Sequence, residues 1–148
     1  MERLAKIVAT LGFFGYSPVA SGTAGTLIAC LVYYLLCGSM AGYFLVTVVV
    51  LILGFWSAGK AEKIFGNIDD RRIVIDEAAG LFISMFLVPF SLKYLIAGFV
   101  IFRIFDIIKP QPARACEKLP GSLGVMMDDI VCGIYTNILL HLLILIKF

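Results

Sequence analysis

Residues 43–58 read Tyr-Phe-Leu-Val-Thr-Val-Val-Val-Leu-Ile-Leu-Gly-Phe-Trp-Ser-Ala, an almost wholly apolar run that carries no charge. It lies within a longer segment, from Lys6 to Lys60, that has no charged residue between its ends. Such a stretch is typical of a helix surrounded by lipid. Of the 148 residues, 61% are hydrophobic and 15% are charged, whereas ordinary soluble domains carry about 25% charged residues. The sequence therefore predicts a membrane protein, with an unusually apolar soluble helical domain as the alternative.

Five apolar helices are predicted, over residues 26–37, 43–58, 77–90, 92–108 and 129–146. Residues 4–14 also have apolar side chains at a helical spacing, but they are too few to cross a bilayer. We therefore expect a helix that lies at the membrane interface or packs under the bundle. The predicted fold class is all-α: a polytopic integral membrane bundle of about four to five apolar helices plus this N-terminal interfacial helix. A perpendicular span needs roughly 20 residues, and several of the predicted helices are shorter than that. A single domain is predicted over residues 1–148.

The basic residues are distributed unequally between the predicted loops. With the N-terminus in the cytoplasm, all of the 12 lysines and arginines except Lys93 and Lys147 lie on the cytoplasmic side. This is the asymmetry that the positive-inside rule expects. It places loops 59–76 and 109–128 in the cytoplasm and the hairpin 38–42 outside. The net charge of +2 and the absence of a basic run argue against a nucleic-acid partner.

Acidic side chains occur in small islands next to the predicted helices. Asp76 and Glu77 open one apolar helix, and Asp128 and Asp129 open another. The positive end of a helix dipole explains a single such pair. Two pairs on the same predicted face, beside Asp106, favour a site for a hard cation. Magnesium prefers carboxylate oxygens and commonly bridges to a substrate phosphate.

Two further motifs carry phosphate-binding chemistry. Arg103, Asp106 and Lys109 recur every three residues on one helical face. They form either a ladder of ion pairs at the interface, or a group in which Asp106 faces the cation while the two basic residues hold phosphate oxygens. Residues 21–26, Ser-Gly-Thr-Ala-Gly-Thr, lie in a predicted loop, 16–26, and favour a phosphate cradle at a helix N-terminus.

The remaining polar residues are predicted to have structural roles. Lys60, Lys63, Arg71 and Arg72 are expected to face anionic lipid, and Asp69 and Asp70 to form a solvated turn. His141 lies in the last apolar helix and is expected to pack there, which removes the usual general base. The spacing of the four cysteines predicts neither a disulfide nor a zinc site.

Four motifs together resemble the phosphatidylglycerophosphatase A family. They are Ser-Gly-Thr-Ala-Gly-Thr (21–26), Ile-Val-Ile-Asp-Glu-Ala-Ala-Gly (73–80), Phe-Arg-Ile-Phe-Asp-Ile-Ile-Lys-Pro-Gln-Pro (102–112) and Gly-Val-Met-Met-Asp-Asp-Ile-Val-Cys-Gly (124–133). The resemblance runs in matching order over residues 15–135.

This resemblance implies a magnesium-dependent lipid phosphatase of the bacterial inner membrane. Such an enzyme converts phosphatidylglycerophosphate to phosphatidylglycerol and phosphate, with its active site facing the cytoplasm. The residues expected to bind Mg²⁺ are Asp76, Glu77, Asp128 and Asp129. Those expected to bind phosphate are Gly22, Thr23, Gly25, Thr26, Arg103 and Lys109, and the catalytic candidates are Asp106, Asp129, Lys109 and Arg103.

Two other functions and two mechanisms stay open on the sequence. A CDP-alcohol phosphotransferase shares Gly124 and Asp128, but its motif needs an Asp at the position of Cys132. A non-enzymatic ion carrier would explain the carboxylates without explaining Arg103 and Lys109. For a phosphatase, either a carboxylate attacks phosphorus, or water activated by the cation attacks with an aspartate as base.

Overall fold

Helices form nearly all of the regular structure in the computed structural model, which describes residues 1–36 and 38–146. Within these residues there are no strands, so the all-α prediction is confirmed. The helices are α1 (Glu2–Ala9), the short 3₁₀ turn η1 (Phe14–Tyr16), α2 (Ser21–Leu35), α3 (Met40–Phe65), α4 (Ile75–Ser84), α5 (Leu92–Ile108), α6 (Ala113–Cys116) and α7 (Ser122–Leu145). Two residues used in the sequence predictions lie outside the described residues: Cys37, in the prediction about the cysteines, and Lys147, in the prediction of charge asymmetry.

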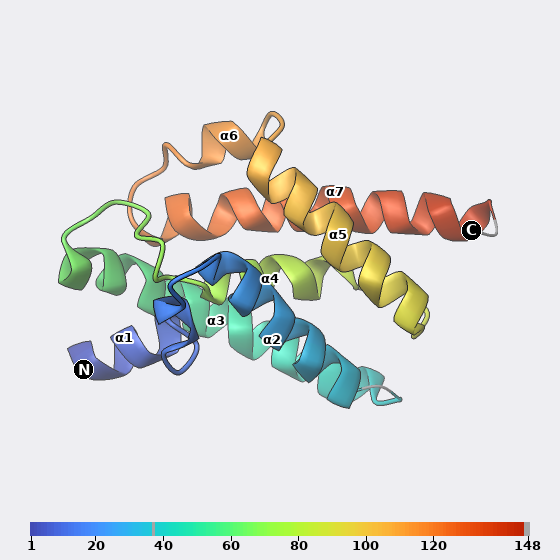
Figure 1. Ribbon diagram of the computed structural model, residues 1–148, viewed down its shortest axis with the longest axis horizontal. Helices are drawn as coiled ribbons and strands as arrows, with labels where there is room; N and C mark the ends of the chain where they lie inside the picture. Colours follow the sequence, from blue (N-terminus) through green and yellow to red (C-terminus); the bar gives the residue numbers. More distant parts are fainter. Residues whose placement is uncertain (37, 147–148) are drawn as a thin grey trace.

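The short helix α4 lies at the centre of the bundle, in contact with α2, α3, α5 and α7 (Figure 1). Its side chains are buried on most sides, including Leu81 and Phe82. The apolar sequence predicted a helix over residues 77–90, but α4 ends at Ser84. The amide of Asn137 explains this end, because it donates to the carbonyls of Ser84 at 3.0 Å and Phe86 at 2.7 Å. A helix C-terminus inside a protein needs such partners.

Glycines allow α4 and α7 to touch backbone to backbone. A Cβ atom on Gly133 of α7 would overlap the carbonyl of Gly80 on α4. A Cβ on Gly80 would in turn lie 2.8 Å from the carbonyl oxygen of Asp129. Small residues of this kind let helices approach closely where lipid supplies no hydrophobic driving force. The close contact brings Asp129 next to the first half of α4.

Two helices, α3 and α7, are long and apolar enough to cross a membrane. Many of their large apolar side chains are exposed, including Phe44 and Ile52 on α3 and Ile138 and Leu142 on α7. Helices α2 and α5 have 15 and 17 residues, which at 1.5 Å per residue is about 22–25 Å, less than the roughly 30 Å of a bilayer core. The predicted four to five spans are therefore not confirmed.

The ends of the bundle differ in character. The polar loops 66–74 and 109–121 lie at the end where α2, α4 and α7 begin, whereas the end of α2, the start of α3 and the start of α5 lie at the other end (Figure 1). The two loops that the charge asymmetry placed on one side thus lie at one end of the bundle, and the side of a membrane that this end faces stays a prediction. The N-terminal helix α1 packs against α3 through Ala5 and Ala9.

Two helix starts differ from the prediction. Helix α2 begins at Ser21, so the stretch 21–26 is helical and not a loop. The Thr26 hydroxyl donates to the carbonyl of Gly22 at 2.8 Å, a bond that fits a helix interior. Helix α7 begins at Ser122, before Asp128 and Asp129. These two acids lie inside a helix, and the dipole of a helix N-terminus therefore does not account for them.

Candidate active site

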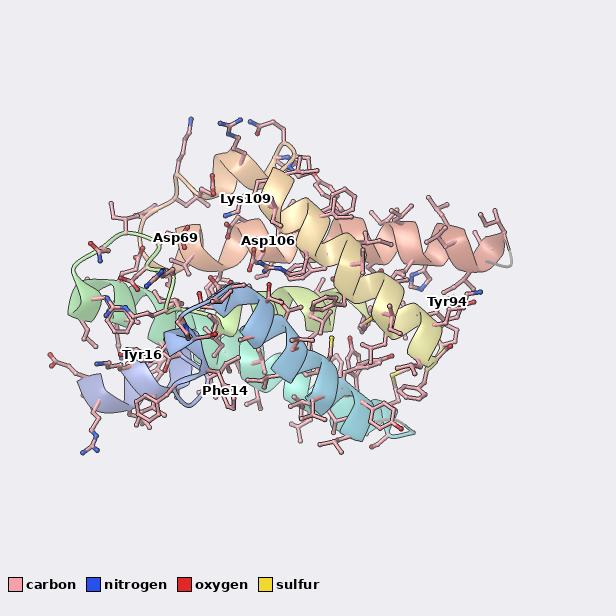
Figure 2. The ribbon with its side chains drawn as sticks, viewed as in Figure 1. Phe14, Tyr16, Asp69, Tyr94, Asp106 and Lys109 are labelled. Atoms are coloured by element: carbon pink, nitrogen blue, oxygen red, sulfur yellow. The ribbon has the colours of Figure 1, made fainter. Side chains whose placement is uncertain are left out.

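A cavity of about 330 Å³ opens at the end of the bundle that carries the polar loops. Figure 2 labels Asp69, from the loop before α4, and Asp106 and Lys109, from the end of α5, all at this end of the bundle. The start of α2, the loop before α4, the start of α4, the end of α5 and the first half of α7 all contribute to it. Its lining residues are Ala20, Ser21, Gly22, Asp69, Arg71, Ile73, Asp76, Glu77, Arg103, Asp106, Lys109, Asp128 and Asp129. The structure thus brings together all the charged residues that the sequence analysis assigned to the site.

Three of the predicted metal ligands form a compact group. Asp76, Glu77 and Asp129 each offer a carboxylate oxygen, and these oxygens lie within 4.8 Å of one another. Asp76 and Glu77 lie in the first turn of α4, as predicted. Burial, together with the charge of Glu77, raises the pKa of Asp76 well above its ordinary value. Burial likewise raises the pKa of Glu77, and the charge of Asp129 adds to the effect.

This donor set fits a divalent cation. Oε2 of Glu77 and Oδ1 of Asp128 are buried and have no hydrogen-bond partner. A buried carboxylate oxygen without a partner is costly, and a cation between these groups would satisfy the oxygens and relieve their mutual repulsion. Carboxylate oxygens are the ligands that Mg²⁺ takes.

Arg103 lies beside the carboxylate group, in an ion pair with Asp106. Its Nη1 atom is 2.6 Å from Oδ2 of Asp106, and both side chains are mostly buried. Gly22 of α2 lies against the same arginine, since a Cβ at that position would be 3.0 Å from Nη1 and would overlap Glu77. A side chain at position 22 would therefore fill the space between α2 and the charged groups.

Lys109 ends α5 in a left-handed conformation, with φ 46°. Its Nζ atom donates to Oδ2 of Asp128 at 2.6 Å and to Oε1 of Glu117 at 2.7 Å. Burial alone lowers the pKa of Lys109, but its hydrogen bonds with Asp128 and Glu117 outweigh this and raise the pKa above its ordinary value. Lys109 therefore stays charged and is held by Oδ2 of Asp128. Oδ1 of Asp128 has no hydrogen-bond partner and is still available to a cation, so the metal-binding role of Asp128 stays a prediction.

Some predicted residues lie elsewhere. Thr23, Gly25 and Thr26 do not line the cavity. Gly25 allows α2 to pack on Val74, where a Cβ would come within 2.8 Å of the valine Cβ. Of the predicted phosphate cradle, only its first residues, including Gly22, reach the site. These residues form the N-terminal end of α2, where a helix has backbone N–H groups without intrahelical partners.

The loop before α4 contributes residues that the sequence analysis missed. Asp69 and Arg71 line the cavity. Asp70 is buried and accepts from Arg72 at 2.6 and 2.7 Å, and the Arg72 guanidinium lies 3.9 Å from the ring centre of Phe65. The expected solvated turn is therefore wrong for Asp70, as is the lipid-facing position for Arg72. Residues 69–72 lie shortly before Asp76 and Glu77 in the sequence, and this position could have identified the loop as part of the site.

No histidine or reactive thiol enters the cavity within the described part of the chain. His141 lies far along α7, with Nδ1 3.0 Å from the carbonyl of Asn137. Cys132 is fully buried and packs with Phe102 and Ala113. The chemistry of the site thus rests on carboxylates and on the cations Arg71, Arg103 and Lys109.

Known proteins share this arrangement of residues along the chain. The family model of phosphatidylglycerophosphatase A matches residues 7–144. A Bacteroides thetaiotaomicron protein, provisionally named a phosphatidylinositol-3-phosphatase, is 42% identical over 85% of this chain and 84% of its own. The phosphatidylglycerophosphatase A of Escherichia coli is 35% identical over 86% of this chain and 76% of its own.

The phosphatidylglycerophosphatase A of Haemophilus influenzae is 35% identical over 78% of this chain and 71% of its own. No solved structure matches the chain significantly. A family match that covers nearly the whole chain, with relatives of this similarity, excludes the phosphotransferase and ion-carrier alternatives. The chain belongs to the phosphatidylglycerophosphatase A family.

Proposed function

We propose that this protein is a magnesium-dependent phosphatase that hydrolyses phosphatidylglycerophosphate to phosphatidylglycerol and phosphate. Membership of the family makes it a phosphatase; the identity of its lipid and its use of Mg²⁺ are the proposal. The observation that carries the proposal is that side chains suited to bind a cation and side chains suited to bind an anion line the same cavity. Three carboxylates suited to a cation lie beside Arg103 and Lys109, which are suited to a phosphate.

The location of the site supports a lipid substrate. The cavity lies at the polar-loop end of a bundle whose two longest helices could cross a membrane. A phospholipid at that surface presents its phosphomonoester to the cavity while its acyl chains remain among the exposed apolar side chains. We place the protein in the bacterial inner membrane with this end in the cytoplasm, in agreement with the basic residues of both loops.

Each charged residue has a distinct task in the proposed reaction. Asp76, Glu77 and Asp129 would hold Mg²⁺, which supplies Lewis-acid stabilisation of the charge on the phosphoryl oxygens. Arg103 binds phosphoryl oxygens through its planar guanidinium, and Asp106 fixes its position. Lys109 adds a second positive charge, held by Asp128 and Glu117. These groups are in place before the substrate arrives, so little reorganisation is needed during the reaction.

We assign the attack on phosphorus to water, with Asp106 as the base. The new bond joins the water oxygen to phosphorus, and the bond from phosphorus to the lipid alcohol breaks. The proton that water loses passes to the Asp106 carboxylate and then to the departing alkoxide, so that charge and atoms balance. The alternative, attack by a carboxylate, would leave a phospho-aspartate. Rapid quench of a single turnover, with the substrate labelled in its phosphomonoester, distinguishes the two routes. Only attack by a carboxylate leaves the label on the protein.

A second candidate substrate is phosphatidylinositol 3-phosphate, because the relative with 42% identity carries that activity in its name. The test is phosphate release by the purified protein from each lipid at equal surface concentration. A kcat/KM that is higher for phosphatidylglycerophosphate supports the proposal, and a higher value for the inositol lipid supports the second candidate. Release from neither lipid overturns both.

A further inference from the structure

Arg71 is the one cation of the cavity that lacks a carboxylate partner among the described residues. Arg103 is paired with Asp106, and Lys109 with Asp128 and Glu117. Arg71 lines the same cavity, its side chain is exposed, and it forms no ion pair with any described residue. An unpaired guanidinium at the edge of a cavity is suited to bind an anion through its two-pronged donor face.

The backbone of Arg71 is fixed on both sides. The Ser21 hydroxyl donates to the carbonyl of Arg71 at 2.6 Å, which ties the loop to the start of α2. The next residue, Arg72, is held by two side-chain hydrogen bonds to Asp70 and by the ring of Phe65. The side chain of Arg71 thus projects from an ordered segment, and less conformational freedom is lost when it binds a ligand.

The cavity has an inner and an outer part. Its inner wall carries Asp76 and Asp129, which are 6% and 3% exposed, and its rim carries the exposed residues Asp69 and Arg71. A phosphomonoester that reaches the carboxylates leaves the rest of the lipid headgroup at the rim. The next anionic group along such a lipid is the phosphodiester that joins the headgroup to the diacylglycerol.

We propose that Arg71 binds the phosphodiester of the lipid substrate, while Arg103 and Lys109 bind the phosphomonoester. This inference rests on the proposed function. Phosphatidylglycerophosphate and phosphatidylinositol 3-phosphate both carry that phosphodiester, so an arginine at the rim serves either headgroup. It also favours these lipids over soluble phosphomonoesters that carry no second anionic group.

The two reaction products separate the two binding places. Orthophosphate resembles the group at the inner wall, and phosphatidylglycerol keeps only the phosphodiester. The experiment measures inhibition of phosphatidylglycerophosphate hydrolysis by each product in mixed micelles, for the wild type, Arg71→Ala and Arg71→Lys. Arg114→Ala is the matched control, because Arg114 is exposed on α6 and does not line the cavity. Substitution at position 71 keeps the backbone carbonyl that Ser21 binds.

For Arg71→Ala we expect the inhibition constant of phosphatidylglycerol and the KM to rise about tenfold or more, the usual effect of losing one hydrogen bond to a charged group. The inhibition constant of orthophosphate should stay within about twofold, because Arg71 does not contact the group bound at the inner wall. Arg71→Lys should recover part of the loss, and Arg114→Ala should change neither constant.

Equal changes for both products, or no change for phosphatidylglycerol, overturn the role of Arg71 and leave the proposed function intact. A wild-type protein that releases no phosphate from phosphatidylglycerophosphate overturns the proposed function, and this inference with it. If Arg71→Ala does not fold, as judged by thermal unfolding in detergent, Arg71→Gln replaces it with the same expected results.

Discussion

Gly133 of α7 packs directly on Gly80 of α4, with no side chain between the two backbones. Four residues before Gly133 lies Asp129, and four residues before Gly80 lies Asp76. Since one helical turn separates the contact from the acids in each helix, the glycine pair sets the distance between the carboxylates. The closeness of the metal-binding group is thus a consequence of two residues that have no side chain.

Replacing Gly133 with Ala should separate α4 from α7 and impair the site. The new methyl group would meet the Gly80 carbonyl, so we expect a loss of about 1–3 kcal/mol of stability and a clear fall in kcat. Thermal unfolding and phosphate release measure the two effects. Ile134→Ala is the control, because Ile134 is the next residue of α7 and is 44% exposed. A Gly133→Ala protein with normal stability and turnover contradicts the packing.

Removal of either phosphate-binding cation should lower kcat/KM sharply. Arg103→Ala and Lys109→Ala should each lose roughly 2–4 kcal/mol of transition-state stabilisation, about 30- to 1000-fold in rate. Arg103→Lys should be intermediate, since it keeps the charge and loses the planar fork. Glu117→Gln is the contrast, because this partner of Lys109 is exposed and an amide oxygen still accepts from Nζ. Near-normal kcat/KM in correctly folded Arg103→Ala and Lys109→Ala proteins would refute these roles.

Asp70 should contribute stability that depends on pH. Its hydrogen bonds with Arg72 hold its pKa well below the ordinary value. A carboxyl group with a lowered folded-state pKa stabilises the protein above its unfolded pKa of about 3.9, and this contribution is lost as the pH falls toward the folded pKa. Asp70→Asn should therefore lower Tm at pH 7 and have a smaller effect at pH 3. Equal Tm differences at the two pH values are incompatible with this ion pair.

Asn137 should be important for the end of α4. Its amide donates to the carbonyls of Ser84 and Phe86, and Asn137→Leu would leave both without this donor. The expected cost is about 1–3 kcal/mol of stability for the Ser84 carbonyl, whose hydrogen bond is partly buried, and less for the Phe86 carbonyl, whose hydrogen bond is exposed. Thermal unfolding in detergent measures it, and Ile138→Ala, at an exposed neighbouring position, is the control. An Asn137→Leu protein as stable as the wild type would show that these carbonyls need no partner.

The charged residues of the site were predicted more accurately from the sequence than the bounds of the helices on which they lie. Asp76, Arg103 and Asp129 were identified because charge is rare in an apolar chain and costly without a function. The start of α7 was misplaced because Gly121 and Gly124 have loop composition. Gly124 instead packs on the carbonyl of Leu119, a contact that depends on tertiary structure and has no local sequence signal.

Partner choice within the site was also beyond the sequence. Asp128 and Asp129 are neighbours and looked equivalent, yet successive helical positions point about 100° apart. Asp129 therefore joins Asp76 and Glu77, while Asp128 binds Lys109. Arg71 and Arg72 differ in the same way, since one lines the cavity and the other pairs with Asp70. Such differences between adjacent residues arise from helix rotation and loop geometry, which composition and spacing do not fix.

We propose that the three-carboxylate group of Asp76, Glu77 and Asp129 holds the Mg²⁺ on which phosphatase activity depends. Its most direct test is phosphate release from phosphatidylglycerophosphate by the purified protein during a Mg²⁺ titration, with wild type and Asp129→Asn compared. We expect that chelator abolishes wild-type activity, that Mg²⁺ restores it, and that Asp129→Asn lacks activity at any Mg²⁺ concentration while still folded. Full turnover in the presence of chelator, together with an active Asp129→Asn protein, would contradict it.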